Sequence, residues 1–230
     1  MCFIDFKKAF DSVDRNLLLY KLLCIGVTGN MYRAISSLYS NPKSRVILQD
    51  HSTEYFDCPI GVKQGDCLSP TLFAIFINDL ADEIRNSEIG IELECEDIAG
   101  NMEVTIINIL LYADDVVLFA TNELDLQSLL FLVQSWCEKW QLEVNLNKTN
   151  ILHIRSKRKQ RSNFMFIFNK HPIPYCNFYK YLGCYVNEHL DFSFMSEMQA
   201  DSAGCALSLI ITKMINKLGL SWAKLSLSWG

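Results

Sequence analysis

Residues 109–119 read ILLYADDVVLF, and this stretch is the most informative in the chain for its fold. Asp114 and Asp115 lie between two apolar runs typical of buried strands, so we expect a tight hairpin that carries both acids at its turn. Two like charges beside a core are costly unless cations neutralise them or their pKa values rise. Because two adjacent aspartates are also a common turn sequence, the pattern has to be weighed together with other segments.

A third acid has the same kind of surroundings. Asp5 follows Phe3 and Ile4 in a short apolar run, which we expect to be a buried strand at the start of the chain. Neither apolar run contains a Lys or Arg that could neutralise these carboxylates. Hard divalent cations are therefore the expected partners, and ligation by oxygen atoms alone favours Mg²⁺ over Zn²⁺.

The loop at residues 60–67 reads IGVKQGDC and precedes a predicted helix. Gly61 and Gly65 allow the backbone to approach a partner closely, and Gln64 offers an amide beside the second glycine. We expect Ser69 to be the N-cap of the helix, which ends near position 85. A glycine turn before a capped helix is the purely structural alternative.

The rest of the chain mixes strands and helices without internal repeats. Asp14 and Asn122 are predicted N-caps of two further helices. The other expected elements are helices at 30–39 and 195–218, strands at 44–48, 54–58, 164–168 and 179–186, an extended segment at 144–155, and an acidic surface excursion at 86–102. This order predicts an α+β fold rather than a regular βα alternation.

Composition excludes several classes of protein. Half of the 230 residues are apolar and one fifth are charged, which argues against disorder. No apolar stretch approaches the ~18 residues of a membrane span, and no secretory leader is visible, so we expect no membrane partner and an intracellular location, cytoplasmic or nuclear. The nine cysteines include no C-x-x-C pair, which favours free thiols in a reducing compartment.

The charge is divided unevenly along the chain. The first 150 residues carry 11 basic and 22 acidic residues, and the remainder carries 10 basic and 4 acidic ones. This asymmetry is consistent with an acidic, metal-holding part beside a basic part that faces a polyanion. A chance imbalance between two solvated faces explains it equally well.

Taken together, these segments resemble the reverse transcriptase domain of non-LTR (LINE-type) retrotransposons. Five family motifs occur in order: FIDFKKAFD at 3–11, GVKQGDCLSP at 61–70, YADD at 112–115, WQLEVNLNKT at 140–149 and YLG at 181–183. The resemblance implies a polymerase palm, which is a ferredoxin-like antiparallel sheet backed by helices, followed by the start of a helical thumb. It implies RNA-directed DNA polymerase activity on an RNA template, a DNA primer and deoxynucleoside triphosphates.

The resemblance also implies catalytic roles. Asp5, Asp114 and Asp115 would hold two Mg²⁺ ions, with Mn²⁺ as a possible substitute, and the Phe6 carbonyl would be a further oxygen ligand. In two-metal phosphoryl transfer, such ions activate the primer hydroxyl and steady the triphosphate. Lys148 would lie near the leaving pyrophosphate, although a lysine at this position can equally be an ordinary surface residue.

Contacts with nucleotide and primer are implied by three further segments. Phe10 fits the steric gate that excludes a 2′-hydroxyl, and core packing is its alternative role. Gln64 and Gly65 would lie near the incoming nucleotide and its template base. The primer-grip hairpin is implied by the last motif, in which Tyr181, Leu182 and Gly183 contact the primer end or simply pack.

The densest basic run in the chain lies between the palm and the primer grip. Its cations are Arg155, Lys157, Arg158, Lys159 and Arg161, which we expect to bind the nucleic-acid backbone in a salt-sensitive, sequence-independent manner. A solvated turn and a nuclear localisation signal are the alternatives.

The family comparison also predicts the domain organisation. We expect a palm at 1–175 with a fingers-like insertion at about 28–60, a primer-grip hairpin at 176–192, and partial thumb helices with an atypical tail at 193–230. The family's fingers precede the first motif, whereas four residues precede Asp5 here. We therefore expect a truncated enzyme that polymerises poorly or not at all by itself.

Two other functions remain compatible with the sequence. A catalytically dead relic of the palm fold could bind nucleic acid or a partner without turnover, and such a protein would be indifferent to Mg²⁺. A two-metal nuclease would use the acids, but it would not need the glycine–glutamine loop or the aromatic gate.

Overall fold

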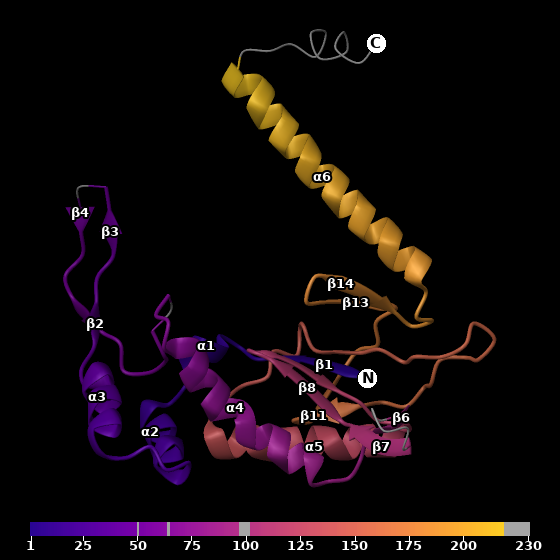
Figure 1. Cartoon of the computed structure of the whole chain (residues 1–230), viewed down its shortest axis with the longest axis horizontal. Coiled ribbons are helices and arrows are strands. Elements are labelled where there is room, and N and C mark those ends of the chain that lie inside the picture. The colour runs from indigo at the N-terminus through magenta and orange to yellow at the C-terminus, as the bar shows by residue number, and fades with distance from the viewer. Residues whose placement is uncertain (50, 64, 97–101, 219–230) are drawn as a thin grey trace. The chain divides into compact units, whose positions relative to one another are not determined.

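The computed structural model of the chain describes residues 1–49, 51–63, 65–96 and 102–218. The chain forms two compact units. The first comprises Met1–Ile151 and Ser162–Tyr175, and the second comprises Leu152–Arg161 and Cys176–Gly230. Figure 1 labels many of the helices and strands.

A four-stranded antiparallel sheet with the order β10-β1-β9-β8 is the centre of the first unit. Its strands are β1 (Cys2–Asp5), β8 (Ile109–Tyr112), β9 (Asp115–Leu118) and β10 (Asn150–Ile151). The apolar residues of β1 and β9 are buried. The expected hairpin and the expected strand at the start of the chain are thus both confirmed. The expectation that both acids lie at the hairpin turn is wrong for Asp115, because it pairs with Tyr112 as the first residue of β9.

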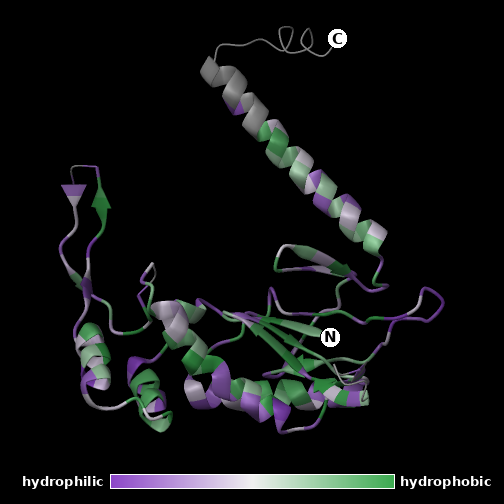
Figure 2. Cartoon of the chain, viewed as in Figure 1, coloured by the Kyte–Doolittle hydropathy of each residue, from purple (hydrophilic) through white to green (hydrophobic). Residues whose placement is uncertain are grey.

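Helices complete the core of this unit. The long ones are α2 (Arg15–Cys24), α3 (Gly29–Tyr39), α4 (Ser69–Arg85) and α5 (Glu123–Trp140), and α1 (Ala9–Ser12) is a single turn. Figure 2 shows mixed hydrophilic and hydrophobic colours on the helices, whereas the central strands are mostly hydrophobic. Trp136 and Phe73 have no exposed surface, as expected of helices whose apolar faces cover a sheet.

Two of the three predicted N-caps, Asp14 and Asn122, are confirmed. The Asp14 side chain accepts hydrogen bonds from the backbone N–H groups of Asn16 and Leu17 at the start of α2. The Asn122 side chain accepts one from the N–H of Asp125 at the start of α5. Each cap satisfies donors that lack an acceptor in the first turn of a helix.

A buried lysine joins three of these helices. The Lys21 ammonium of α2 lies 2.7 Å from Asp79 Oδ1 of α4 and 3.7 Å from the centre of the Trp140 ring of α5. It also donates a hydrogen bond to the Phe76 carbonyl. Burial lowers the pKa of Lys21 to about 8 despite the carboxylate of Asp79.

The prediction that Ser69 caps α4 is wrong. Leu68 occupies the N-cap position, and Ser69 is the first residue of the helix. The Asp66 side chain instead accepts a hydrogen bond from the N–H of Leu68 at 3.1 Å. The buried Ser69 hydroxyl lies 3.4 Å from the Tyr39 hydroxyl, so tertiary contacts decide its role.

The hairpin expected at 44–58 is present but interrupted. β2 (Lys43–Ser44) pairs with β5 (Phe56–Asp57), and β3 (Ile47–Leu48) pairs with β4 (His51–Ser52). Between these pairs, the Thr53 N–H donates a hydrogen bond to the Val46 carbonyl, whereas the N–H of Val46 donates to the Thr53 hydroxyl instead of a backbone carbonyl. Its strands carry exposed side chains on both faces and project away from α3 (Figure 1).

The apolar residues from 104 to 112 are divided between two strands. β7 (Met102–Ile107) pairs with β6 (Ile91–Glu96), so the surface excursion expected at 86–102 belongs to a hairpin that extends to Ile107. Asn108 separates β7 from β8 because its buried side chain donates a hydrogen bond to the Ile84 carbonyl of α4.

The segment expected to be extended at 144–155 is mostly not a strand. The N–H groups of Lys148 and Thr149 both donate to the Asn145 carbonyl, which closes a tight turn before β10. The strand expected at 164–168 is reduced to β11 (Ile167–Phe168), paired with β12 (His171–Pro172).

In its described residues, the second unit contains one hairpin and one long helix. β13 (Phe178–Tyr181) pairs with β14 (Cys184–Asn187), and α6 (Phe192–Leu218) follows. In the part of the chain that the structure describes, no helix is both long and apolar enough to cross a membrane. Six cysteines of the described part are free thiols, namely Cys24, Cys58, Cys67, Cys137, Cys184 and Cys205.

Candidate active site

Acids from distant parts of the sequence face each other on the central sheet. Asp5 of β1 lies directly opposite Asp115 of β9 in the strand register. Side chains opposed in this way project from the same face, with Cβ atoms ~4.5–5.5 Å apart. Asp114 occupies the turn of the hairpin together with Ala113, whose φ is +53°. Two-residue hairpin turns need such positive φ values, which cost a residue other than glycine roughly 1–2 kcal/mol.

The three carboxylates interact electrostatically. Partial burial raises the pKa of Asp115, and the charges of Asp114 and Asp5 raise this pKa further. Lys148 acts on Asp115 in the opposite direction. A cation bound among these acids would relieve their repulsion and favour the ionised form of each.

The turn at 145–149 holds Asp5 in place. The Asn145 amide donates a hydrogen bond to Asp5 Oδ2 at 2.9 Å, and the Asn145 N–H donates to the Asp5 carbonyl at 2.7 Å. The Lys148 ammonium lies 3.7 Å from Asp5 Oδ1. The Thr149 hydroxyl accepts a hydrogen bond from the Asp5 N–H at 3.4 Å. The Asp5 side chain is only 20% exposed.

A cavity of about 840 Å³ opens beside these residues. Among its lining residues are Asp5, Phe6, Asp114, Asn145 and Lys148. The donors that it offers to a metal are carboxylate and carbonyl oxygens, which suit Mg²⁺. Within the described ranges, no three His, Cys, Asp or Glu side chains are already arranged as a metal-holding group.

The glycine-containing loop lies against the segment that follows Asp5. The N–H of Gly61 donates to the Val13 carbonyl and that of Val62 to the Phe10 carbonyl, both at 2.8 Å. Gly61 has φ +84°, and a Cβ there would lie 2.7 Å from the Asp11 carbonyl oxygen. A glycine is therefore required by close backbone contact within the protein itself. Gly65 also has positive φ but faces open space, and Gln64 lies outside the described residues.

The Phe10 ring is fixed by a neighbouring aromatic residue. It stacks on Phe73 of α4 with ring centres 4.6 Å apart and an interplanar angle of 26°. Phe73 is fully buried, whereas Phe10 is only partly buried. Packing therefore explains one face of the Phe10 ring.

The residues expected to form the primer grip lie in the second unit. Leu182 and Gly183 form the turn between β13 and β14 and have φ values of +48° and +85°. Tyr181 is paired with Cys184 next to this turn. Leu182 is half exposed, so an apolar side chain is presented at the tip of the hairpin.

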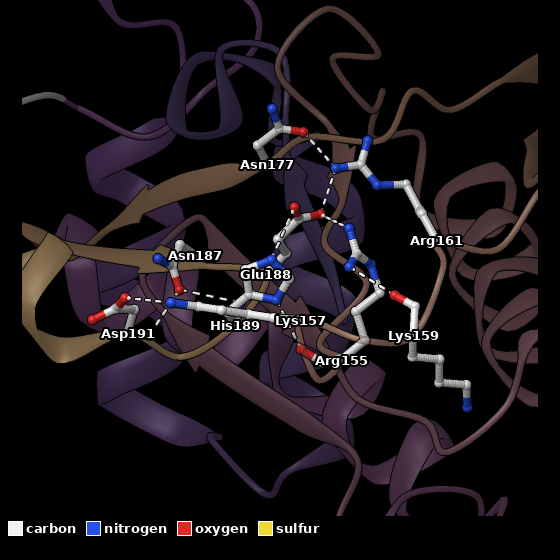
Figure 3. Close-up of polar contacts among 9 residues, drawn as sticks. All are labelled: Arg155, Lys157, Lys159, Arg161, Asn177, Asn187, Glu188, His189 and Asp191. Carbon is white, nitrogen blue, oxygen red and sulfur yellow. Dashed lines mark hydrogen bonds and ion pairs between the residues drawn. The ribbon is translucent and has the colours of Figure 1, made fainter.

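The five expected phosphate-binding cations differ in their surroundings, and Figure 3 shows four of them, Arg155, Lys157, Lys159 and Arg161. Arg155 and Arg161 both form ion pairs with Glu188. Lys157 lies 3.3 Å from Asp191. Arg158 and Lys159 are exposed in the turn between the two arginines.

Two residues that organise these regions were not expected from the sequence as site residues. Asn145 orients Asp5 by a hydrogen bond. In the sequence, Asn145 is marked only by the N-x-x-K-T pattern at 145–149, which does not reveal the carboxylate that the asparagine contacts. Glu188 collects two arginines, and an isolated glutamate after a strand carries no comparable signal.

Oxygen ligands gathered on one face of an antiparallel sheet are typical of metal-dependent phosphoryl-transfer enzymes. Comparison with known proteins identifies the family within this class of enzymes. The model of the family described as reverse transcriptase (RNA-dependent DNA polymerase) matches residues 1–186. The chain belongs to this reverse transcriptase family.

Several curated relatives come from mobile elements. The RNA-directed DNA polymerase from mobile element jockey of Drosophila funebris is 27% identical over 197 residues, which cover 83% of this chain and 20% of that protein. The Pol polyprotein of retrotransposable element R2DM of Drosophila melanogaster is 31% identical over 158 residues, which cover 69% of this chain and 14% of that protein. For the R2 polyprotein of Popillia japonica, the identity is 25% over 186 residues, with 78% of this chain and 29% of that protein covered. The chain thus spans less than a third of the length of each of these relatives.

Proposed function

We propose that the chain forms the catalytic palm of an RNA-directed DNA polymerase of a non-LTR retrotransposon, which copies an RNA template from a DNA primer. The observation that carries this proposal is the register that sets Asp5 opposite Asp115. Family membership and the names of the relatives support the same activity. In this proposal the first unit is the palm, residues 176–192 are the primer-grip hairpin, and α6 begins the thumb.

Asp5, Asp114 and Asp115 are proposed to hold two Mg²⁺ ions, with the Phe6 carbonyl as an additional ligand. When bound, such ions activate the primer hydroxyl and stabilise charge on the phosphates. The chain itself supplies rigidity, because Asp5 is held on a buried strand by Asn145 and Thr149. It also supplies positive charge, since the Lys148 ammonium lies close enough to Asp5 to reach phosphates bound beside it.

Selection of the nucleotide is proposed to rest on Phe10, Gln64 and Gly65. The stacking of Phe10 on Phe73 restricts movement of the ring, so a 2′-hydroxyl placed against the ring would collide with it. The hydrogen bonds of Gly61 and Val62 attach the loop to the backbone near Phe10, which keeps gate and loop together. Tyr181, Leu182 and Gly183 are proposed to meet the primer end.

The proposal is tested by equilibrium binding of dATP in the presence of Mg²⁺. We expect binding that requires Mg²⁺, that is lost in Asp5→Asn and Asp114→Asn, and that is weaker for ATP than for dATP. Phe10→Val should narrow the difference between the two nucleotides. Nucleotide binding that is unchanged in both aspartate variants would overturn the proposal.

Primer extension on an RNA template distinguishes the alternatives. We expect slow extension that depends on deoxynucleotides and on both aspartates. Cleavage of nucleic acid without deoxynucleotides would indicate a nuclease. Nucleic-acid binding that ignores both Mg²⁺ and the aspartate substitutions would indicate a non-catalytic palm.

A further inference from the structure

The basic segment at 155–161 contains two kinds of cation. The side chains of Arg155 and Arg161 are 12% and 30% exposed and share the carboxylate of Glu188, which is 15% exposed. Lys157, in contrast, is 73% exposed, and residues 156–160 are all exposed. We call Arg155, Arg161 and Glu188 the clasp, and Lys157, Arg158 and Lys159 the basic turn.

The clasp joins two separate stretches of the second unit. Arg155 Nη2 lies 2.9 Å from Glu188 Oε2, and Arg161 Nη2 contacts the same oxygen. The N–H of Arg155 donates to the Glu188 carbonyl at 2.8 Å, which adds a backbone contact between the same stretches. Asn177 accepts a further hydrogen bond from Arg161 (Figure 3).

Hydrogen bonding from Arg161 lowers the pKa of Glu188, in keeping with a carboxylate held in its ionised form. If either arginine left the clasp to bind a phosphate, a mostly buried carboxylate would lose a charged partner. Loss of a partner from such a group is costly. The clasp arginines are therefore committed to Glu188.

The clasp also shapes the basic turn. Arg155 Nη1 donates a hydrogen bond to the Lys159 carbonyl at 2.9 Å, and the Lys159 N–H donates to the Ser156 carbonyl at 3.0 Å. These bonds close the turn at its base, and Figure 3 shows the Lys159 side chain extending away from Glu188. The ion pair of Lys157 with the partly buried Asp191 is weak, because the Lys157 ammonium is exposed to solvent that screens it.

We propose that the basic turn binds the phosphate backbone of nucleic acid and that Arg155 and Arg161 are positioning residues which do not contact phosphate. The nature of the partner rests on the proposed polymerase function. Three exposed cations on a closed turn offer sequence-independent contacts, because point charges read the backbone rather than the bases.

Two matched double variants test this division. Arg158→Ala with Lys159→Ala, and Arg155→Ala with Arg161→Ala, each remove two positive charges from the same seven residues. Binding of a fluorescent RNA–DNA primer–template is measured by anisotropy over a range of salt concentrations. Thermal unfolding is measured in parallel, and binding is compared well below both unfolding temperatures.

We expect the turn variant to reduce the slope of log K against log salt by roughly 1.4–1.8, because each phosphate contact contributes about 0.7–0.9. If both proteins bind equally at about 1 M salt, this corresponds to a ~25- to 60-fold loss of affinity at about 0.1 M salt, with an unchanged unfolding temperature. The clasp variant should unfold at a lower temperature but keep the wild-type slope. Equal losses of slope in both variants, or an unaffected turn variant, would overturn the proposal.

If the clasp variant does not fold, Arg161→Gln combined with Glu188→Gln replaces it, because this pair removes one charge of each sign. Its slope should equal that of the wild type, and a reduced slope contradicts the proposal. Failure here is distinguishable from failure of the polymerase function. If primer–template binding depends on the basic turn but dATP binding does not depend on Mg²⁺, only the catalytic proposal fails. If dATP binding depends on Mg²⁺ but primer–template binding does not depend on the basic turn, only the proposal for the basic turn fails.

Discussion

Replacing Asn145 with alanine removes the side chain that orients the carboxylate of Asp5. The amide of Asn145 donates a 2.9 Å hydrogen bond to Asp5 Oδ2, and the Asp5 side chain is only 20 % exposed. Hydrogen bonds to charged groups contribute ~1.5–3 kcal/mol. The neighbouring backbone bond from Asn145 to Asp5 is retained in the variant. We therefore expect a loss near the lower end, ~1.5–2 kcal/mol.

Thermal unfolding without metal measures this loss directly. For a chain of 150–250 residues, ~1 kcal/mol shifts the unfolding temperature by ~2–4 °C, so Asn145→Ala should unfold ~3–8 °C lower than the wild type. Asn145→Asp should lose more, because it adds a fourth carboxylate beside Asp5. Mg²⁺ should restore part of the stability of Asn145→Asp by neutralising the added charge.

Asn147 provides a matched control. It is the same residue type two positions away, is exposed, and lines a different cavity from Asp5. Asn147→Ala should change stability by less than ~0.5 kcal/mol, as is usual for surface substitutions. If the two alanine variants lose the same stability, or if Asn145→Ala loses none, Asn145 does not orient Asp5.

Three further predictions concern stability. Gly61→Ala should lower the free energy of unfolding by roughly 2–4 kcal/mol, because the added Cβ would clash with main-chain atoms of α1. Gly65→Ala should lower it by only about 1 kcal/mol, because the added Cβ meets no neighbour and only the positive φ is unfavourable. Denaturant unfolding of the two variants measures both losses. The pKa of Lys21 is about 8 in the folded protein and 10.5 in the unfolded protein, so the unfolded state binds more protons between these pH values. The free energy of unfolding should therefore rise between pH 8 and 10.5, by roughly 2 kcal/mol relative to Lys21→Met. Equal pH profiles of the unfolding free energy in the two proteins argue against the buried cation. Because Arg161 lowers the pKa of Glu188, Glu188→Gln should cost ~1–3 kcal/mol of unfolding free energy at neutral pH. This difference in stability from the wild type should shrink as the pH falls below about 4.5, where Glu188 becomes protonated. A difference in stability that persists in acid excludes the ion pair as its cause.

Strong local signals account for the parts of the fold that the sequence predicts. The hairpin around Asp114 is predictable because two apolar runs flank polar turn residues, and pairing is fixed by the strands. The starts of α2 and α5 are predictable because Asp14 and Asn122 satisfy the first backbone donors without any help from tertiary contacts.

Tertiary contacts decided the parts that differ from the sequence expectation. Ser69 has the residue type of an N-cap, yet Asp66 binds the backbone before the helix and Tyr39 lies against the serine hydroxyl. Asn108 ends a strand within an apolar run because its amide binds the end of α4. Tyr39 lies 30 positions from Ser69 and Ile84 lies 24 positions from Asn108, so neither contact can be recognised from the local sequence pattern.

The candidate site shows the same division. The three acids could be recognised from their apolar flanks and from the resemblance to a family. The contact between Asn145 and Asp5 depends on the pairing of Phe6 with Val144, which joins the residue after β1 to the segment after α5. Likewise, the partition of the basic segment depends on Glu188, whose position opposite two arginines exists only in the folded chain.

The most direct test of a shared metal site is the dependence of unfolding temperature on Mg²⁺ in four proteins. These are the wild type, Asp5→Asn, Asp114→Asn and the control Asp201→Asn, in which the acid is exposed on α6. At roughly 10–100 times the dissociation constant, bound Mg²⁺ should stabilise the wild type and the control by ~1.4–2.7 kcal/mol, or ~3–10 °C. Both site variants should lose this gain. An equal rise in all four proteins would mean that Asp5 and Asp114 do not share a cation.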